Sequence, residues 1–164
     1  MFLKKFLLKK RVESAKEFFN FEEAQKFCEL YYSDYVKMLD DALIRKIMRI
    51  ESAGRNCMYD GEVIDAIKRA LKMFPGIPFD IIVYRGGDLW IPDRPFLSGS
   101  FLKDIAVGFA KGDESDLHRI LLRKGAKIIP IYSLNRLVIN HGDPEMELIL
   151  DMRKRKTLFR LFEI

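Results

Sequence analysis

The decisive stretch of this chain reads Ile81-Ile82-Val83-Tyr84-Arg85-Gly86-Gly87. Its unbroken apolar run predicts a strand that is buried on both faces. An arginine held at the end of such a strand binds phosphate oxygens through two parallel hydrogen bonds, a geometry that lysine lacks. The two glycines allow a ligand to approach the backbone closely. The stretch therefore indicates an anion-binding strand end, although a salt-bridging arginine before a turn has the same local pattern.

After Pro78 the sequence consists of short apolar runs separated by turn residues, which is the pattern of strands. One helix is expected after Ser100, and it ends near Gly112. The predicted strands span 80–85, 95–100, 118–123, 126–132, 136–140, 145–151 and 157–163.

The first half of the chain has a helical period instead. Asn20 and Glu23 have the spacing of a capping box, and apolar residues then recur at steps of three and four. We expect a break in this helical region near Ser33-Asp34, a further helix capped by Asp60, and a stop at Pro75-Gly76.

Length and composition indicate one globular domain over residues 1–164. The chain is 49% hydrophobic and 32% charged, and it is long enough to bury a core. Helices first and strands afterwards predict an α+β fold with mostly antiparallel strands. Residues 1–75 are expected to be mainly helical, and residues 80–164 to be mainly strands that carry the motifs.

The sequence holds too few ligands for a structural metal site. Cys28 and Cys57 form no CxxC pair, and His118 and His141 stand far from both. We expect no metal, reduced thiols in a cytoplasm, and histidines in surface or sheet positions. The sequence motifs of Rossmann folds, P-loops, zinc proteases and serine hydrolases are absent.

Basic residues gather near both ends of the chain. Phe2, Leu3, Phe6 and Leu7 share a helical face beside lysines, which suits an anionic membrane surface or else a docked or frayed terminal helix. The cluster Arg153-Lys154-Arg155-Lys156 predicts a solvated turn between the last two strands, with a basic docking patch as the alternative. The net charge of +5 favours anionic partners, and no stretch is suited to span a bilayer.

Two further motifs follow the arginine in order. Ser98 and Ser100 flank Gly99 on a predicted strand, so both hydroxyls face one side and can orient a carboxylate or a ribose. The same pattern also occurs at strand ends and helix N-caps. Glu145 and Glu147 are two residues apart at a strand entrance, which predicts that both carboxylates project to one side, unless they are simply an exposed pair on an edge strand.

Two carboxylates on one side suit glycosyl transfer from NAD. Ordinary glycosidases place their carboxylates on opposite sides of the bond because one of them must protonate the leaving group. Nicotinamide leaves without that assistance, since its ring nitrogen already carries positive charge. One carboxylate can then stabilise the ribosyl oxocarbenium while the other prepares the incoming nucleophile.

Together these motifs resemble the Arg-Ser-Glu class of mono-ADP-ribosyltransferases. That class has an arginine ending an early strand, a Ser-Thr-Ser strand before a helix with Ala and Phe, and a late Glu-x-Glu. The corresponding residues here are Tyr84-Arg85-Gly86, Phe96-Leu97-Ser98-Gly99-Ser100, Ile105-Ala106-Val107-Gly108-Phe109-Ala110 and Glu145-Met146-Glu147. The resemblance covers residues 80 to 151 and is closest to the phage-encoded enzymes that act inside infected bacteria, with bacterial toxin domains as close competitors. Gly99 replaces the middle threonine, a change we expect to be tolerated because that position faces away from the site.

The resemblance implies a fold and a set of roles. The helical N-terminal half would pack on two mostly antiparallel β-sheets with an NAD cleft between them. Arg85 would anchor NAD through its phosphates, and the backbone at Gly86 would receive the nicotinamide amide. Ser98 would hold the catalytic glutamate, Ser100 would also contact NAD, and Glu147 would be the catalytic residue that stabilises the oxocarbenium.

The resemblance also implies an acceptor. Glu145 would take a proton from the attacking group, and a glutamate here, rather than a glutamine, marks arginine as the acceptor within the family. The loop Asn140-His141-Gly142-Asp143-Pro144 would recognise it. The expected protein is a monomeric enzyme in a bacterial host cytoplasm that modifies a protein, with nucleic acid as a second acceptor class. An NAD glycohydrolase using the same residues and a non-catalytic basic nucleic-acid-binding module are the alternatives.

Overall fold

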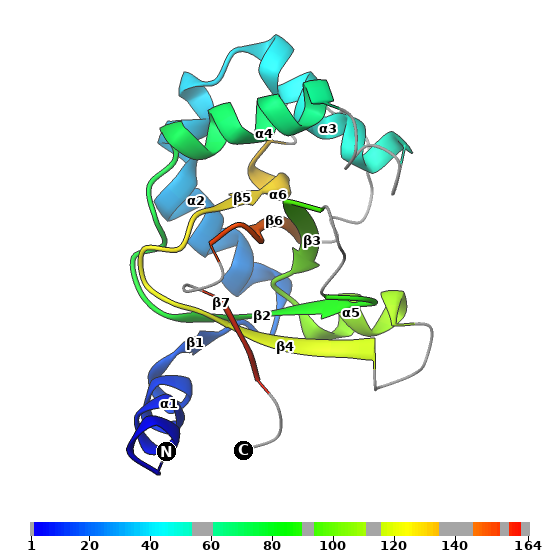
Figure 1. Ribbon diagram of the computed structural model, residues 1–164. Helices are drawn as coiled ribbons and strands as arrows, with labels where there is room; N and C mark the ends of the chain where they lie inside the picture. Colours follow the sequence, from blue (N-terminus) through cyan, green and yellow to red (C-terminus); the bar gives the residue numbers. More distant parts are fainter. Residues whose placement is uncertain are drawn as a thin grey trace.

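In the computed structural model the long helices lie in the first half of the chain and most of the strands in the second, as Figure 1 shows. The structure describes residues 2–53, 61–89, 94–110, 116–134, 146–154 and 158–161. The helices are α1 (Phe2–Ser14), α2 (Phe21–Met38), α3 (Asp41–Ala53), α4 (Gly61–Met73), α5 (Lys103–Phe109) and α6 (Ile131–Leu134). The strands are β1 (Lys16–Glu17), β2 (Ile81–Gly86), β3 (Phe96–Ser100), β4 (Leu117–Leu122), β5 (Ile128–Pro130), β6 (Glu147–Asp151) and β7 (Leu158–Leu161).

The described strands belong to one sheet with the order β5-β6-β3-β2-β4-β7, and β1 pairs with β2. Every pairing is antiparallel except that of β1 with β2, which is parallel. The expectation of two separate sheets is therefore corrected to one continuous sheet. The expectation of a mixed α+β architecture with mostly antiparallel strands is confirmed.

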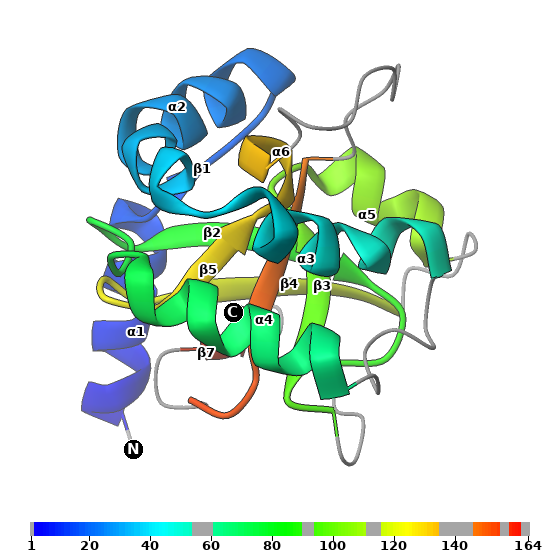
Figure 2. The same cartoon turned by 90° about the horizontal axis from the view of Figure 1, so that it is seen from above.

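The sheet curls because two strands share one edge of β2. β1 pairs with Ile81 and Ile82, while β3 meets β2 only through the pair Tyr84 and Ser100. A single shared pair cannot hold two strands side by side over their length, so β3 turns away and runs at a steep angle to β2 in both views (Figures 1 and 2). Beyond this point β3 is paired along its whole length with β6.

Strand β2 is buried on both faces, as its apolar run predicted. Ile81 and Val83 pack into the large core that α2, α3 and α4 cover. Ile82 and Tyr84 pack on the other face into a smaller cluster, which includes residues of α5 and α1. Because side chains alternate along β2, one face of the strand packs against α2, α3 and α4, and the other packs against α1 and α5.

The capping box at the start of α2 is confirmed. The backbone N–H of Glu23 donates to Asn20 Oδ1 at 2.9 Å, and the Glu23 carboxylate accepts from the backbone N–H of Phe19 at 3.1 Å. This last bond is the main reason that the pKa of Glu23 is lowered from its ordinary value.

The predicted break near Ser33-Asp34 is wrong, because α2 continues through it to Met38. The Ser33 hydroxyl donates to the Glu29 carbonyl at 2.6 Å and so is satisfied within the helix. The break falls instead before Asp41, where the Asp40 carboxylate accepts from the Leu43 N–H at 2.7 Å and caps α3.

Replacing Asn20 with alanine should destabilise the protein by about 1 kcal/mol, because the Glu23 N–H loses its acceptor at the helix end. Thermal unfolding should then occur about 2–4 °C lower for a chain of this size. Asn20→Ser is the matched control, since serine also caps. Equal melting temperatures for the alanine and serine variants would show that the cap contributes nothing.

The other predicted elements have mixed outcomes. The helix ending before Pro75-Gly76 is confirmed, since α4 ends at Met73. The strand predicted for 126–132 is shorter, because residues from Ile131 to Leu134 form α6. The strand predicted for 136–140, the cap at Asp60 and the acceptor loop at 140–144 lie outside the described residues.

No helix in the described part of the chain is both long and apolar enough to cross a membrane. Across the same residues, no three His, Cys, Asp or Glu side chains are grouped as a metal ion would require.

Candidate functional site

The three motifs lie on three neighbouring strands, β2, β3 and β6. Arg85 lies near the end of β2, Ser98 and Ser100 lie on β3, and Glu147 begins β6. Ser100 is the direct register partner of both Tyr84 on β2 and Glu147 on β6. Arg85 is 13 positions before Ser98 and 62 positions before Glu147 in the sequence, and their strands meet where the sheet bends.

Arg85 bridges the opening between β2 and β3. Its Nε donates to the Asp88 carbonyl at 2.7 Å, and its Nη1 donates to the Ser98 carbonyl. The second bond joins the two strands two residues beyond their single ladder pair, where the strands have diverged. These contacts orient the guanidinium from two directions, which lysine could not reproduce with one ammonium group.

The two serines occupy different environments on the same side of β3. Ser100 is buried, and its hydroxyl accepts from the backbone N–H of Leu102 at 3.1 Å, just before α5. Ser98 is half-buried and lies opposite Ile149. Because the register places Ser100 opposite Glu147, Ser98 is the diagonal neighbour of Glu147, still within reach of a long side chain.

Glu147 is half-buried, and the residue before it has an unusual backbone. Met146 is buried and has a φ of 44°, in the left-handed region that residues other than glycine rarely adopt. The Met146 carbonyl accepts from the Phe101 N–H at 3.1 Å, so the bend is tied to the end of β3. β6 begins directly after this bend, at Glu147.

The prediction that both glutamates project to one side of a strand depends on extended backbone from 145 onward. Met146 has a φ of 44°, and β6 begins only at Glu147. Glu145 itself lies outside the described residues, so its placement stays a prediction.

Gly86 follows Arg85 and is required by packing. A Cβ atom at this position would lie 2.1 Å from the Ala106 carbonyl oxygen and 2.6 Å from the Ala110 nitrogen. Both atoms belong to the backbone of α5 or its end, so α5 packs directly on the end of β2. The packing of α5 therefore requires glycine at position 86, whether or not a ligand also approaches the backbone there.

Gly99, where the class that the motifs resemble has threonine, is also closely packed. A Cβ atom there would lie 2.9 Å from the Tyr84 carbonyl oxygen and 3.3 Å from Leu150 Cδ1. The departure from Ser-Thr-Ser thus coincides with the point where β2 and β3 approach each other.

We expect Gly99→Thr to destabilise the protein by about 1–3 kcal/mol, because a backbone oxygen must move to admit the new side chain. Gly99→Ala should have a smaller effect in the same direction. Urea unfolding of both variants measures the difference. A threonine variant as stable as the natural chain would show that the strand spacing can relax without cost.

His118 lies beside this site and was expected in a surface or sheet position without a role in the site. It is buried, and it is the register partner of Arg85 on the β4 side. The expectation of a surface or sheet position is thus met by a sheet position. The residues Asp88 and Met146 were also missed, since both act through backbone geometry, which leaves no motif in a sequence.

The predicted solvated turn after β6 is confirmed for Arg153 and Lys154, which are exposed, while Arg155 and Lys156 lie outside the described residues. Arg153 lies in a turn, but its guanidinium forms two hydrogen bonds of 2.9 Å with Asp151 and packs over the Phe96 ring at 4.9 Å. The Asp151 carboxylate raises the pKa of Arg153, chiefly by hydrogen bonding. The pair of Arg153 and Asp151 lies at one end of β3 and β6, and Ser100 and Glu147 lie at the other end.

Cys28 is buried in the core on α2, away from these strands. Burial raises the pKa of its thiol to about 12. A thiol of this kind is protonated at neutral pH and is a poor nucleophile.

Of the comparisons with known proteins, only that with solved structures gives a match. No protein-family profile matches the chain, and no curated protein matches it significantly in sequence. Among solved structures, it is similar to Plx2a, an ADP-ribosyltransferase toxin from Paenibacillus larvae. The identity is 16%, the TM-score is 0.56, and the match covers 79% of this chain and 82% of the toxin. The chain therefore has a fold like that of an ADP-ribosyltransferase toxin.

Proposed function

We propose that this protein is an NAD-dependent mono-ADP-ribosyltransferase that transfers ADP-ribose to arginine side chains of a protein, in a bacterial cytoplasm. The observation that carries the proposal is the meeting of Arg85, the Ser98-Gly99-Ser100 strand and Glu147 on β2, β3 and β6. This meeting occurs within a fold similar to that of an ADP-ribosyltransferase toxin. The Arg-Ser-Glu class assignment rests on the motifs themselves.

The donor chemistry of these residues fits NAD. A guanidinium oriented by two carbonyls offers N–H groups in the fork geometry that phosphate oxygens match. A half-buried carboxylate at Glu147 suits the positive charge that develops on the ribose. Ser98 and Ser100 flank this carboxylate on the neighbouring strand, and we assign them its positioning.

In the proposed reaction, the bond between ribose C1′ and the nicotinamide nitrogen breaks, and its electron pair neutralises the nicotinamide ring. Glu147 stabilises the positive charge left on the ribose. A guanidine nitrogen of the acceptor arginine then bonds to C1′ and releases a proton, which Glu145 accepts. The arginine preference rests on the glutamate at 145, by the family resemblance.

Incubation of a bacterial lysate with the protein and NAD labelled on its adenine tests the proposal. We expect label on protein, with arginine as the modified residue in mass spectrometry. Free labelled ADP-ribose with unlabelled macromolecules would identify an NAD glycohydrolase. Label on nucleic acid would show that the acceptor is nucleic acid and not protein. Unchanged NAD would overturn the proposal that the protein is an enzyme.

Arg85→Lys should weaken NAD binding roughly 10- to 100-fold, since charge-assisted hydrogen bonds contribute about 1.5–3 kcal/mol each. The KM for NAD measured by nicotinamide release is the appropriate readout. Arg119→Lys is the matched control, because Arg119 lies in the same sheet but bonds Glu17 of β1 at 3.1 Å. A similar KM for both variants would remove Arg85 from the NAD site.

A further inference from the structure

Helix α1 has two apolar faces, of which the fold uses only one. Leu8 and Val12 pack against the cluster that contains Ile82 and Tyr84 of β2. The helix is held there by the Lys16 N–H, which donates to the Asp80 carbonyl at 2.9 Å, and by the contact of Arg11 with the Asp80 carboxylate at 4.0 Å. The terminal helix is therefore docked on the sheet.

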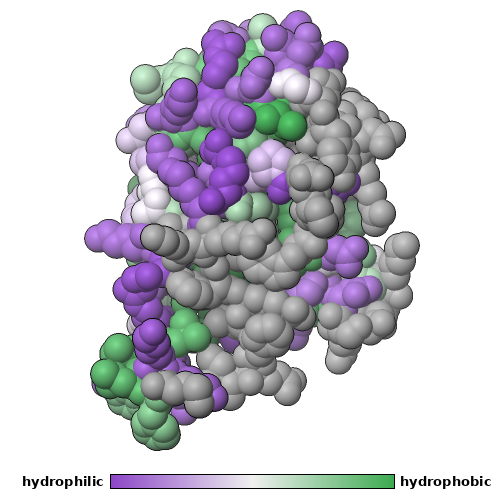
Figure 3. Space-filling view, in the orientation of Figure 1, coloured by the Kyte–Doolittle hydropathy of each residue, from purple (hydrophilic) through white to green (hydrophobic). Residues whose placement is uncertain are grey.

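The second face of α1 points away from the protein. Phe2, Leu3, Phe6 and Leu7 are 48% to 88% exposed. At 3.6 residues per turn these four form one stripe, roughly opposite to Leu8 and Val12. Figure 3 shows hydrophobic atoms gathered at the lower left end of the molecule, where α1 projects in Figure 1. Contiguous apolar surface of this kind marks an interaction site more often than single exposed residues do.

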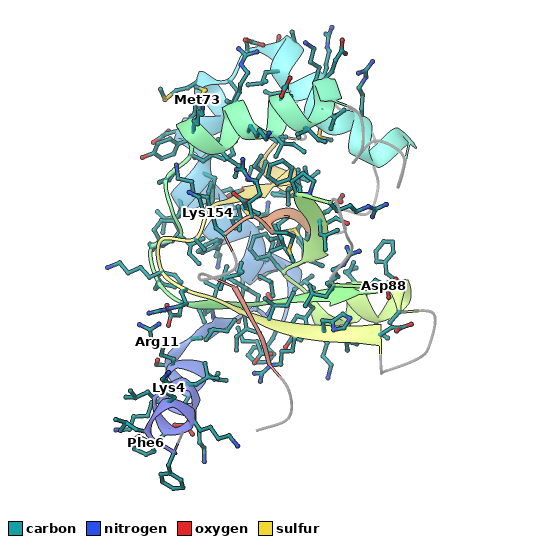
Figure 4. The ribbon with its side chains drawn as sticks, in the orientation of Figure 1. Lys4, Phe6, Arg11, Met73, Asp88 and Lys154 are labelled. Carbon is teal, nitrogen blue, oxygen red and sulfur yellow. The ribbon has the colours of Figure 1, made fainter. Side chains whose placement is uncertain are left out.

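The helix that carries this outward face is basic, and by helical geometry Lys10 lies on the face and Lys9 at its edge. α1 carries Lys4, Lys5, Lys9, Lys10 and Arg11, with Glu13 as its single acid. Lys10 lies over the Phe6 ring at 4.9 Å, so a cation borders the apolar stripe directly. Figure 4 shows Phe6 near the free end of the helix, while Arg11 lies closer to the sheet.

The exposed apolar residues of α2 provide a contrast. Leu30 and Met38 are also well exposed, but α2 begins with Glu22 and Glu23 and carries both signs of charge along its length. The outward face of α1 combines apolar side chains with cations. A complementary partner presents negative charge to the cations and hydrocarbon below it to the apolar side chains. An anionic lipid bilayer has this layered chemistry, whereas an acidic protein patch lacks the hydrocarbon layer.

We propose that the outward face of α1 docks the protein on an anionic membrane surface, with Phe2, Leu3, Phe6 and Leu7 entering the headgroup region and the lysines contacting lipid phosphates. α1 and α5 pack on the same face of β2 but lie at its opposite ends in both ribbon views (Figures 1 and 2). Docking by α1 therefore leaves the Arg85 end of β2 turned away from the bilayer. This proposal is independent of the catalytic one.

Flotation with lipid vesicles tests the proposal. The full chain should bind vesicles of three parts phosphatidylcholine to one part phosphatidylserine at least tenfold more tightly than phosphatidylcholine alone, since each basic residue near the surface adds roughly fivefold. Binding should weaken at 1 M salt, where the Debye length is about 3 Å.

Two double variants distinguish vesicle binding by α1 from nonspecific binding by any exposed apolar surface. Phe2→Ser with Phe6→Ser should lower binding to the anionic vesicles at least tenfold without changing the melting temperature, because both side chains are exposed. Leu30→Ser with Met38→Ser, which removes exposed apolar surface from α2, should bind like the natural chain. Equal binding to both vesicle types, or full binding by the Phe2 and Phe6 variant, overturns the proposal. Dimerisation lost in that variant, without vesicle binding, would assign the face to a second copy instead.

Discussion

Glu147→Gln should lower kcat for nicotinamide release from NAD by at least about 100-fold, both with an acceptor and with water. The amide keeps the size and shape of the side chain but removes the negative charge that would stabilise the ribosyl cation. Because the charge matters only as the glycosidic bond breaks, the KM for NAD should change much less than kcat. Nicotinamide release followed by chromatography measures both constants.

Two controls separate catalysis from folding at this position. Glu62→Gln removes a carboxylate that pairs with Arg49 at 3.2 Å between α3 and α4, and it should leave kcat unchanged. Glu145→Gln should abolish transfer to arginine while retaining some NAD hydrolysis, because that residue is assigned only to the acceptor. If Glu147→Gln retains full kcat in a folded protein, Glu147 is not the catalytic residue.

Gly86→Ala should have the largest effect on stability, at least about 3 kcal/mol, because the new methyl group would overlap the α5 backbone. A loss of this size lowers the melting temperature by roughly 6–12 °C in a chain of this length. The contact atoms are backbone atoms, so they cannot avoid the methyl group by rotating a side chain. Either α5 moves or the end of β2 does, and both changes displace Arg85.

Gly108→Ala is the control, and it should change the stability in the opposite direction. Gly108 also belongs to this region, on α5, but a Cβ atom there would meet nothing within 4 Å. Alanine is favoured over glycine in a helix, so this variant should be stabilised by about 0.5–1 kcal/mol. Equal melting temperatures for the two alanine variants would contradict the close packing of α5 on β2.

Local features of the fold were predictable because a short stretch of sequence determines them. The Asn20 and Glu23 capping box, the stop before Pro75-Gly76 and the buried strand at 81–86 each depend on residues close together in the chain. The break in the helical region was misplaced, because Ser33 has a local acceptor inside the helix and does not end it.

The candidate site was predictable in its residue types but not in its geometry. The order of Arg85, Ser98, Ser100 and Glu147 is visible in the sequence, and the resemblance assigned them to one site. Their register was not visible: the structure places Ser100 directly opposite Glu147 and Ser98 diagonal to it. The left-handed backbone at Met146 was equally hidden, because the side chain of methionine gives no sign of a positive φ.

The sequence by itself determined most of the helices and strands and the chemical groups they carry, since propensity, capping and alternation act over a few residues. Only the tertiary structure decided that β1 and β3 share one edge of β2, so that a single sheet bends at Tyr84 and Ser100. That bend brings the guanidinium onto the Ser98 carbonyl and makes glycine necessary at 99, while the packing of α5 on β2 makes it necessary at 86. The physical reason is that strand pairing and close backbone packing join residues far apart in the chain, whose contacts no local pattern records.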